Sequence, residues 1–172
     1  AERYKGHARI IDALPAIARQ ALDVTYLVGG AGDDLPALAA QAVARGVRDR
    51  VIFAGAVPAD ELADHYALAD VFAMPSTGEG FGIVFLEAAM MGLPLVGGAV
   101  DGSADALADG QIGRLVDPLH EPQLVAALLE ALAGRQQRDA AAVHRFAFVN
   151  FARHVDLLLG DLLDARTPAA VP

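Results

Sequence analysis

The chain has 172 residues, of which 55% are hydrophobic and 20% charged, and its formal net charge is −9. A chain of this length and composition can bury a sizeable core, which excludes an intrinsically disordered protein. The acidic balance argues against a nucleic-acid-binding groove, which needs a basic stripe. It does not exclude a small phosphorylated ligand held by a few backbone amides and one or two cations.

No stretch reaches the roughly 18 uninterrupted apolar residues of a membrane span. The longest apolar stretch, residues 82–100, is interrupted by Glu87, Gly92, Pro94 and Gly97. The first residues are not followed by the apolar segment of a signal peptide, and the absence of cysteine fits a reducing compartment. We therefore predict a cytoplasmic protein. The chain opens without methionine, within what looks like a loop, so we expect it to be a fragment of a longer protein.

Helical and strand patterns alternate along the chain. Apolar residues at helical spacing predict helices, and short apolar runs that end at glycine or proline predict strands. The predicted helices are residues 8–20, 35–45, 58 or 60 to 69, 83–91, 103–108, 122–133 and, as one or two helices, 138–164. The predicted strands are residues 24–28, 51–54, 71–74, 95–96 and 113–116. We expect one Rossmann-like domain over residues 1–134, C-terminal helices over 135–166 that pack on it, and a loose tail over 167–172.

This alternation predicts the α/β class with a doubly wound parallel sheet. Because the pattern starts with a helix, it corresponds to such a fold without its first strand. In the common strand order 3-2-1-4-5-6 the first strand is central, and its neighbours would lose pairing on both sides. Either that strand lies upstream of Ala1, or the strands around Leu27 and Phe72 pair directly.

The clearest candidate site is the glycine-rich loop MPSTGEGFG, residues 74–82. It leads from the carboxyl end of a predicted strand into the start of the helix 83–91. Ligands of parallel α/β proteins bind at this edge, and a helix start favours anions because its first N–H groups are free and its dipole end is positive.

Two carboxylates accompany this loop. Glu87 is the single charge in an otherwise apolar helix, so it needs a partner, either a neighbouring loop or a ligand hydroxyl such as that of a ribose. Glu79 lies between glycines, and Gly80 and Gly82 allow the backbone to approach a ligand closely. A carboxylate pair also occurs in glycoside hydrolases. We disfavour that interpretation, because a helix start suited to anions has no evident task in hydrolysing a neutral sugar.

Other candidates have weaker support. Ser76 and Thr77 can donate to a phosphate or cap the turn, and Lys5 is either a cation at the same edge of the sheet or a solvated charge. The segment GGAG, residues 29–32, lacks the third glycine of a dinucleotide fingerprint and is predicted to be a turn. The five histidines show no metal-ligand spacing, so we predict no metal site.

Together these segments resemble the donor-binding, C-terminal half of the retaining glycosyltransferases of family 4 (glycosyl transferases group 1), which have the GT-B fold. The resemblance covers residues 3–133, and its most specific feature is a pair of glutamates separated by seven residues. It is carried by RYKGH at 3–7, LVGGAGDD at 27–34, VIFAGAV at 51–57, ADVFAMPSTGEGFGIVFLEA at 69–88, GLPLVGG at 92–98, DGSADAL at 101–107 and GRLVDP at 113–118. Within the family, RYKGH, STGEGFGIVFLE and DGSADAL are most similar to bacterial exopolysaccharide mannosyltransferases.

The resemblance implies a role for each matching residue. Lys5 would contact the donor diphosphate, Glu87 would hold the ribose, and Glu79 would bond the hydroxyls of the donor sugar as the residue nearest the reaction. The other donor-binding positions would be Ser76, the backbone N–H groups of Gly80, Phe81 and Gly82, and, near the base, Gly55, Ala56 and Val57. Family members transfer a hexosyl group from a nucleotide sugar, of the GDP-mannose or UDP-glucose type here, with retention and without a metal or other cofactor.

Three departures from the family pattern matter. The family's Gly-Arg after the first strand is absent, Asp105 stands where glutamate is common, and the N-terminal acceptor-binding domain is missing. We therefore expect the fragment alone to be inactive and its partner to be that domain. Membrane contact would arise only through a lipid-linked acceptor, at the inner membrane face. The alternatives are a stand-alone nucleotide-sugar-binding module and a nucleotide-sugar epimerase of the GT-B fold.

Overall fold

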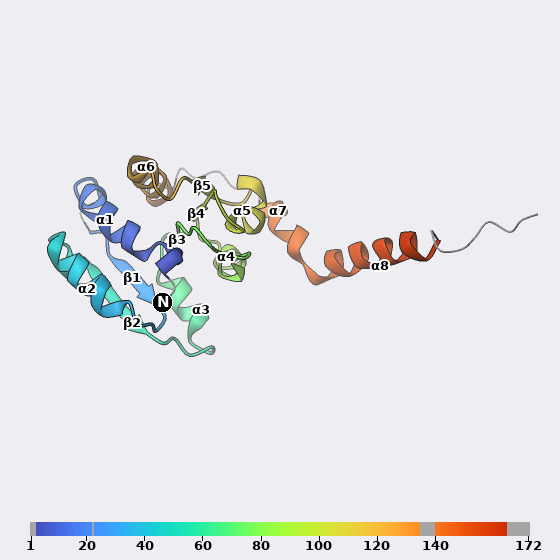
Figure 1. Ribbon diagram of the computed structural model, residues 1–172, viewed down its shortest axis with the longest axis horizontal. Helices are drawn as coiled ribbons and strands as arrows, with labels where there is room; N and C mark the ends of the chain where they lie inside the picture. Colours follow the sequence, from blue (N-terminus) through green and yellow to red (C-terminus); the bar gives the residue numbers. More distant parts are fainter. Residues whose placement is uncertain (1–2, 22, 135–139, 165–172) are drawn as a thin grey trace, which may run out of the picture. The chain divides into compact units, whose positions relative to one another are not determined.

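The computed structural model describes residues 3–21, 23–134 and 140–164 (Figure 1). The chain divides into two compact units, Ala1–Arg138 and Asp139–Pro172, which are described separately. The first unit is an α/β domain, as the sequence predicts.

The described residues of the first unit contain five short strands: β1 (Tyr26–Gly29), β2 (Val51–Gly55), β3 (Phe72–Met74), β4 (Leu95–Gly98) and β5 (Arg114–Val116). All described pairings are parallel. Strand β1 pairs with β2, and separately β3 pairs with β4, which pairs with β5.

The sheet is therefore divided between β1 and β3. This is the arrangement that results when the central strand is removed from the order 3-2-1-4-5-6. The alternative prediction, in which the strands around Leu27 and Phe72 pair directly, is wrong, because these strands belong to different sheets. The physical reason is that each of these strands has its own parallel partner, since β1 pairs with β2 and β3 pairs with β4.

The helices of the first unit follow the predicted order. They are α1 (His7–Ala18), α2 (Leu35–Ala44), α3 (Leu62–Ala67), α4 (Ile83–Met90), α5 (Ser103–Ala106) and α6 (Glu121–Leu132), with 3-10 turns at Arg3–Lys5, Arg48–Arg50 and Ala108–Gly110. Helix α3 is shorter than expected, because residues 59–61 form a turn. Proline occupies the first turn of α2 and of α6, where a missing N–H costs nothing.

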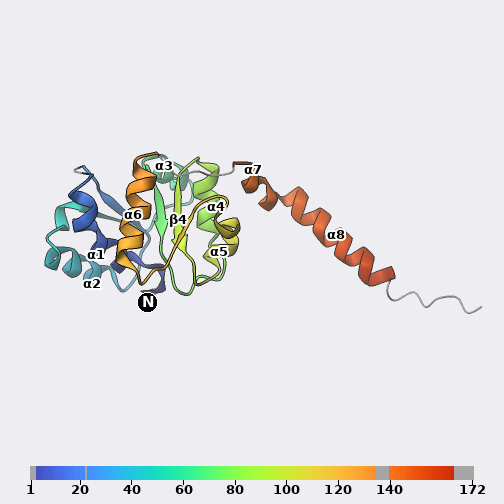
Figure 2. The same ribbon diagram turned by 90° about the horizontal axis from the view of Figure 1, so that it is seen from above.

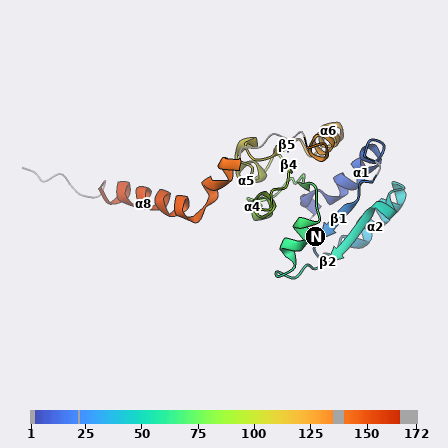
Figure 3. The ribbon, with the colours of Figure 1, turned by 180° about the vertical axis from the view of Figure 1, so that it is seen from behind.

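Helix α1 holds the two sheets together through two apolar stripes. Ile11 and Leu14 pack with residues of β1, β2 and α2, whereas Ala13 and Ile17 pack with residues of β4, β5 and α6. Helices α1 and α6 lie side by side (Figures 1 and 2), and α4 lies on the other face of β4 (Figure 3). The helical spacing of apolar residues predicted the helix, and its position between the two sheets comes from the structure.

The second unit contains α7 (Ala140–Val143), a 3-10 turn (His144–Phe146) and α8 (Phe148–Asp164). The predicted packing of residues 135–166 on the first domain stays a prediction, and the predicted tail 167–172 lies outside the described residues. Among the described residues, no helix has both the length and the apolar character needed to cross a membrane.

Candidate functional site

Three segments of the first unit lie together at the edge of the sheet where β3 and β4 end. These are the turn at residues 3–6 that leads into α1, the loop 75–82 between β3 and α4, and the loop 99–102 after β4. The backbone connects all three, since Thr77 N–H donates to the carbonyl of Tyr4 and Gly102 N–H donates to the carbonyl of Glu79, both at 2.9 Å. Lys5 and the glycine-rich loop therefore share an edge, as the sequence predicts.

Glycine is required at position 6 by two independent constraints. Gly6 caps α1 with a φ of 85°, a conformation that side chains disfavour. A Cβ atom at this position would lie 2.3 Å from the carbonyl oxygen of Pro75. The start of α1 is thus pressed against the end of β3, and this contact fixes where Lys5 stands relative to the loop.

The carboxylate of Asp101 links the loops that follow β3 and β4. Its oxygens accept hydrogen bonds from the backbone N–H of Glu79 at 2.8 Å and of Ser103 at 3.0 Å. Partial desolvation raises the pKa of Asp101, but hydrogen bonds from those N–H groups and from the hydroxyls of Ser76 and Ser103 outweigh it and lower the pKa below its usual value. Asp101 therefore remains a carboxylate that holds Glu79 in place.

This role of Asp101 was not predicted from the sequence. The local signal was present, because an aspartate two residues before a serine at a helix start is typical of a turn that its side chain closes. The contact with Glu79, however, joins residues that are 22 positions apart. It depends on the parallel pairing of β3 with β4, which brings the two loops together.

Ser76 lies beneath the loop and not at its surface. Its side chain is fully buried, and its hydroxyl lies 2.9 Å from the hydroxyl of Ser103, which is also fully buried. A direct contact between this hydroxyl and a ligand would require the loop to open. We therefore assign Ser76 to the support of the loop, and the donor-binding role that the resemblance implies for it stays a prediction.

We expect Asp101→Asn to lower the free energy of unfolding by about 1–2 kcal/mol at pH 7, because one charge-assisted hydrogen bond is lost at a partly exposed site. Since folding lowers the pKa of this carboxyl, its contribution is complete above the unfolded-state pKa of about 3.9 and is lost as the pH falls through the lower folded-state value. Urea unfolding of both proteins between pH 7 and pH 3 measures this. The difference in the free energy of unfolding between wild type and Asp101→Asn should shrink below about pH 4.

Asp105→Asn provides the matched control, because this aspartate lies four positions further on and its side chain is exposed. Its stability difference from wild type should stay small at every pH. An Asp101→Asn difference that stays constant down to pH 3 would contradict the assignment.

The carboxylate of Glu79 lies against the loop itself. Its Oε1 accepts a hydrogen bond of 3.1 Å from the N–H of Gly80. Two residues later, Gly82 caps α4 with a φ of 89°, and a Cβ there would lie 2.8 Å from the ring of Phe85. The chain thus turns sharply into α4, whose first N–H groups point toward the loop. In the sequence, Gly80, Phe81 and Gly82 separate Glu79 from these donors.

Glu87 has the partner that its position in an apolar helix requires. The hydroxyl of Tyr66 in α3 donates to its Oε2 at 2.8 Å. The pKa of Tyr66 is raised first by desolvation and then by the hydrogen bond to Glu87 and its negative charge. The expectation of a partner is thus confirmed, and the partner is a tyrosine of the neighbouring helix α3. The predicted contact of Glu87 with a ribose stays a prediction.

Gly55 is the last residue of β2, and residues 56 and 57 continue from its carboxyl end. Gly55 has a φ of 73°, and its carbonyl accepts a hydrogen bond of 2.7 Å from the N–H of Gly30. In the GGAG segment, Gly29 ends β1, Gly30 forms a bend and residues 31–32 are irregular, so the segment leaves the strand here much as the predicted turn requires.

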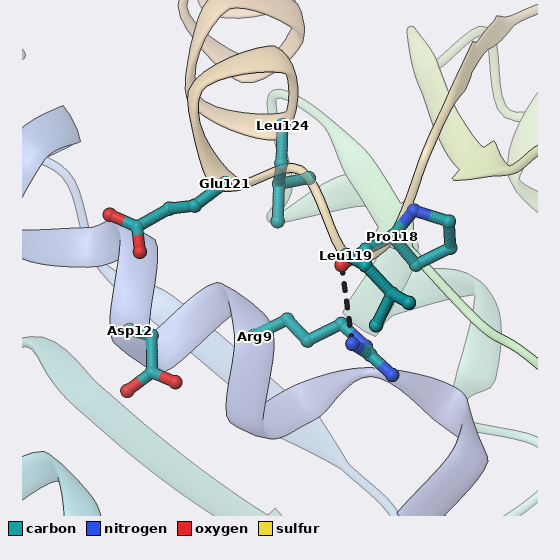
Figure 4. A pocket seen from close by; sticks show the side chains of 6 residues that line it. All are labelled: Arg9, Asp12, Pro118, Leu119, Glu121 and Leu124. Atoms are coloured by element: carbon teal, nitrogen blue, oxygen red, sulfur yellow. Dashed lines mark hydrogen bonds between the residues drawn. The ribbon is translucent and has the colours of Figure 1, made fainter.

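A cavity of about 150 Å³ lies between α1 and the start of α6 (Figure 4). Its lining residues are Arg9, Asp12, Pro118, Leu119, Glu121 and Leu124. Arg9 donates to the carbonyl of Pro118 at 3.2 Å, and Asp12 accepts from Gln41 and Arg45, each at 2.7 Å. None of the predicted site residues lines this cavity, and we do not identify it with the candidate site. Among the described residues there is also no cluster of His, Cys, Asp or Glu suited to a metal ion.

Comparison with known proteins gives a family match over most of the chain. The sequence model of the glycosyl transferases group 1 family matches residues 1–134. A GDP-mannose-dependent alpha-(1-6)-phosphatidylinositol monomannoside mannosyltransferase of Mycolicibacterium smegmatis is 36% identical over 175 residues, which are 96% of this chain and 46% of the relative. A D-inositol 3-phosphate glycosyltransferase of Geodermatophilus obscurus is 36% identical over 88% of this chain and 34% of the relative.

Solved structures show the same architecture. Anabaena HepE, solved in complex with UDP and glucose, superposes with a TM-score of 0.77 and 25% identity over 94% of this chain and 46% of its own. Sucrose-phosphate synthase from Thermosynechococcus elongatus gives a TM-score of 0.75 at 25% identity over 95% of this chain and 43% of its own. The chain therefore spans less than half the length of these relatives.

Proposed function

Because the chain belongs to the glycosyl transferases group 1 family, we propose that it is the donor-binding half of a retaining, metal-independent hexosyltransferase with GDP-mannose as donor. The observation that carries the proposal is the joined edge of three segments. The turn 3–6 with Lys5, the loop 75–82 with Glu79 and the loop 99–102 are held together there by the backbone bonds from Thr77 to Tyr4 and from Gly102 to Glu79.

The charges at this edge suit a nucleoside diphosphate linked to a sugar. Lys5 supplies a cation for the diphosphate, and the start of the eight-residue helix α4 supplies N–H donors and a positive dipole end. The negative charge of Asp101 is engaged by two backbone N–H groups. Glu79 and Glu87 remain as acceptors, and acceptors suit the hydroxyls of a hexose and a ribose.

Each residue then has a task in this proposal. Glu79 bonds the hydroxyls of the sugar and is the residue nearest the transferred carbon. Glu87 accepts from the ribose, and the loop Gly55–Val57 lies beside the base. The backbone of residues 80–82 contributes N–H groups, and buried Ser76 holds the loop from below. The acceptor is bound by a second half of the protein, so the present chain alone binds donor without transferring it.

The mycobacterial relative is 36% identical and is described as GDP-mannose-dependent, which favours GDP-mannose over a UDP-sugar as the donor. The complex of HepE with UDP and glucose supports the UDP alternative at lower identity. Calorimetric titration of GDP, UDP and ADP into the intact protein measures the preference. GDP should bind most tightly, and no binding of any of the three would overturn the proposal.

We expect Lys5→Ala to weaken GDP binding about tenfold, because one charge-assisted contact to the diphosphate is worth about 1.5 kcal/mol. Guanosine, which carries no phosphate, should bind both proteins equally. Arg19→Ala is the matched control, since this exposed cation lies at the other end of α1 and should change neither affinity. Equal weakening of GDP and guanosine by Lys5→Ala would contradict the assignment of Lys5 to the diphosphate.

The two alternative functions differ in their products. A transferase releases GDP from GDP-mannose only when an acceptor is present. A stand-alone binding module would bind GDP-mannose and release no GDP under any condition, and an epimerase would return a nucleotide sugar with altered sugar configuration. Chromatography of GDP-mannose after incubation with the full-length protein and a glycan or lipid-linked acceptor separates the three.

A further inference from the structure

We propose that Tyr66 is a positioning residue of the donor site, which orients the carboxylate of Glu87 for the ribose. The inference rests on the proposed function and extends it to α3, an element that the sequence pattern left without a role. The hydrogen bond of 2.8 Å from the Tyr66 hydroxyl to Glu87 Oε2 is the contact that carries it.

Glu87 needs an orienting group because its own helix offers none. Its neighbours in α4 are apolar, and a glutamate side chain has rotatable bonds that scatter the carboxylate over many positions. A carboxylate presents about four lone-pair sites on its two oxygens. The Tyr66 hydroxyl occupies one of them and fixes the plane of the group, and sites on both oxygens remain for the two adjacent hydroxyls of a ribose.

Tyr66 is itself held by a chain of aromatic contacts. Its ring packs edge-on against Phe72 with centroids 5.9 Å apart, and Phe72 packs edge-on against Phe85 at 5.4 Å. Phe85 is fully buried and lies in α4, two residues before Glu87. The contacts therefore form a closed circuit from α4 through β3 and α3 back to α4. The hydroxyl is located by rigid rings, and the carboxylate is located by the hydroxyl.

In the hydrogen bond between Tyr66 and Glu87, the tyrosine hydroxyl is always the donor. Burial and the neighbouring carboxylate raise the pKa of Tyr66, so its hydroxyl stays protonated and donates at every physiological pH. The hydroxyl also lies 3.5 Å from the carbonyl oxygen of Val84, one turn before Glu87. Both acceptors belong to α4, so the hydroxyl keeps α3 against the helix that starts at the glycine-rich loop.

A purely structural role for Tyr66 predicts a different result from a positioning role. If Tyr66 only packs α3, its loss weakens every ligand alike. If it acts through Glu87, its loss matters only when the ligand carries ribose hydroxyls. Binding of GDP and of 2′,3′-dideoxy-GDP to the intact protein distinguishes these cases by calorimetry, with UDP and its dideoxy form used in the same way should UDP bind more tightly.

Tyr66→Phe keeps the ring and its contact with Phe72 and removes the hydroxyl alone. We expect it to weaken GDP binding about 2-fold to 12-fold, the range for one side chain that must be ordered on binding. Binding of 2′,3′-dideoxy-GDP should change less than about 2-fold, within the range of additive error. Equal weakening of both ligands, or no weakening of GDP, would overturn the proposal.

A double-variant cycle tests whether Tyr66 acts through Glu87. Glu87→Gln alone should weaken GDP binding, and adding Tyr66→Phe to it should have little further effect, because the group to be oriented is already altered. Full additivity of the two substitutions would contradict the proposal even if Tyr66→Phe alone loses stability. Failure of the proposed function itself has a separate signature, in which the wild-type protein binds no nucleotide or Glu87→Gln leaves GDP binding unchanged.

Discussion

Replacing Glu87 with alanine is expected to weaken binding of the donor nucleotide about 100-fold, which corresponds to about 2.7 kcal/mol. The expectation follows from the loss of two hydrogen bonds between ribose hydroxyls and a charged acceptor. A site built around such bonds also leaves the ligand hydroxyls without partners when the acceptor is removed. Calorimetry with GDP, UDP and ADP measures the change, and the nucleotide that binds wild type most tightly should show it.

The chain offers a closely matched control for this substitution. Glu130 is also a glutamate in an apolar helix, α6, and its side chain is half-buried like that of Glu87. Glu130→Ala should leave nucleotide affinity within about 2-fold of wild type, because the residue belongs to an element with no part in the proposed site. If Glu87→Ala and Glu130→Ala have the same effect, Glu87 does not contact the ligand.

The second large effect is expected for Gly6→Ala, which should lower the free energy of unfolding by about 3 kcal/mol. A left-handed backbone costs a residue with a Cβ about 1–2 kcal/mol, and a clash in a packed region adds about 1–3 kcal/mol. Both apply at Gly6, whose φ is 85° and where a Cβ would lie 2.3 Å from the Pro75 carbonyl oxygen. Urea unfolding monitored by circular dichroism measures the loss.

Two other glycines separate the contributions of backbone strain and of the clash. Gly46 has a φ of 69° and open space around its Cβ position, so Gly46→Ala should cost about 1 kcal/mol. Gly32 has open space and no positive φ, so its substitution should be neutral or should stabilise by about 0.5 kcal/mol. An equal loss for Gly6→Ala and Gly46→Ala would show that the start of α1 can move away from β3. That would contradict the fixed placement of Lys5 beside the loop.

Local sequence patterns predicted the elements of this fold because the signals themselves are local. Helical spacing of apolar residues indicated the helix α1, and the glycines around Glu79 indicated a loop that enters a helix. The same patterns left two arrangements open for the strands around Leu27 and Phe72. Which of them forms depends on the pairing partners of each strand, and those lie far along the chain.

In the candidate site, too, the features set by local sequence were predicted and those set by distant contacts were not. The need for a partner of Glu87 followed from one carboxylate in an apolar helix, whereas Tyr66, 21 residues away, was not predicted as that partner. The contact exists because α3 packs beside α4 through Phe72, which is a consequence of tertiary structure. Ser76 illustrates the converse case. Its residue type suited a phosphate contact, but the pairing of β3 with β4 buries it against Ser103.

A crystal structure of the protein soaked or grown with GDP tests whether the nucleotide binds at the glycine-rich loop. The ribose hydroxyls should lie within hydrogen-bonding distance of the Glu87 carboxylate, about 2.5–3.0 Å for O–H···O contacts. The diphosphate should lie between Lys5 and the start of α4. A nucleotide bound instead in the cavity between α1 and α6, against Arg9 and Glu121, would contradict this placement.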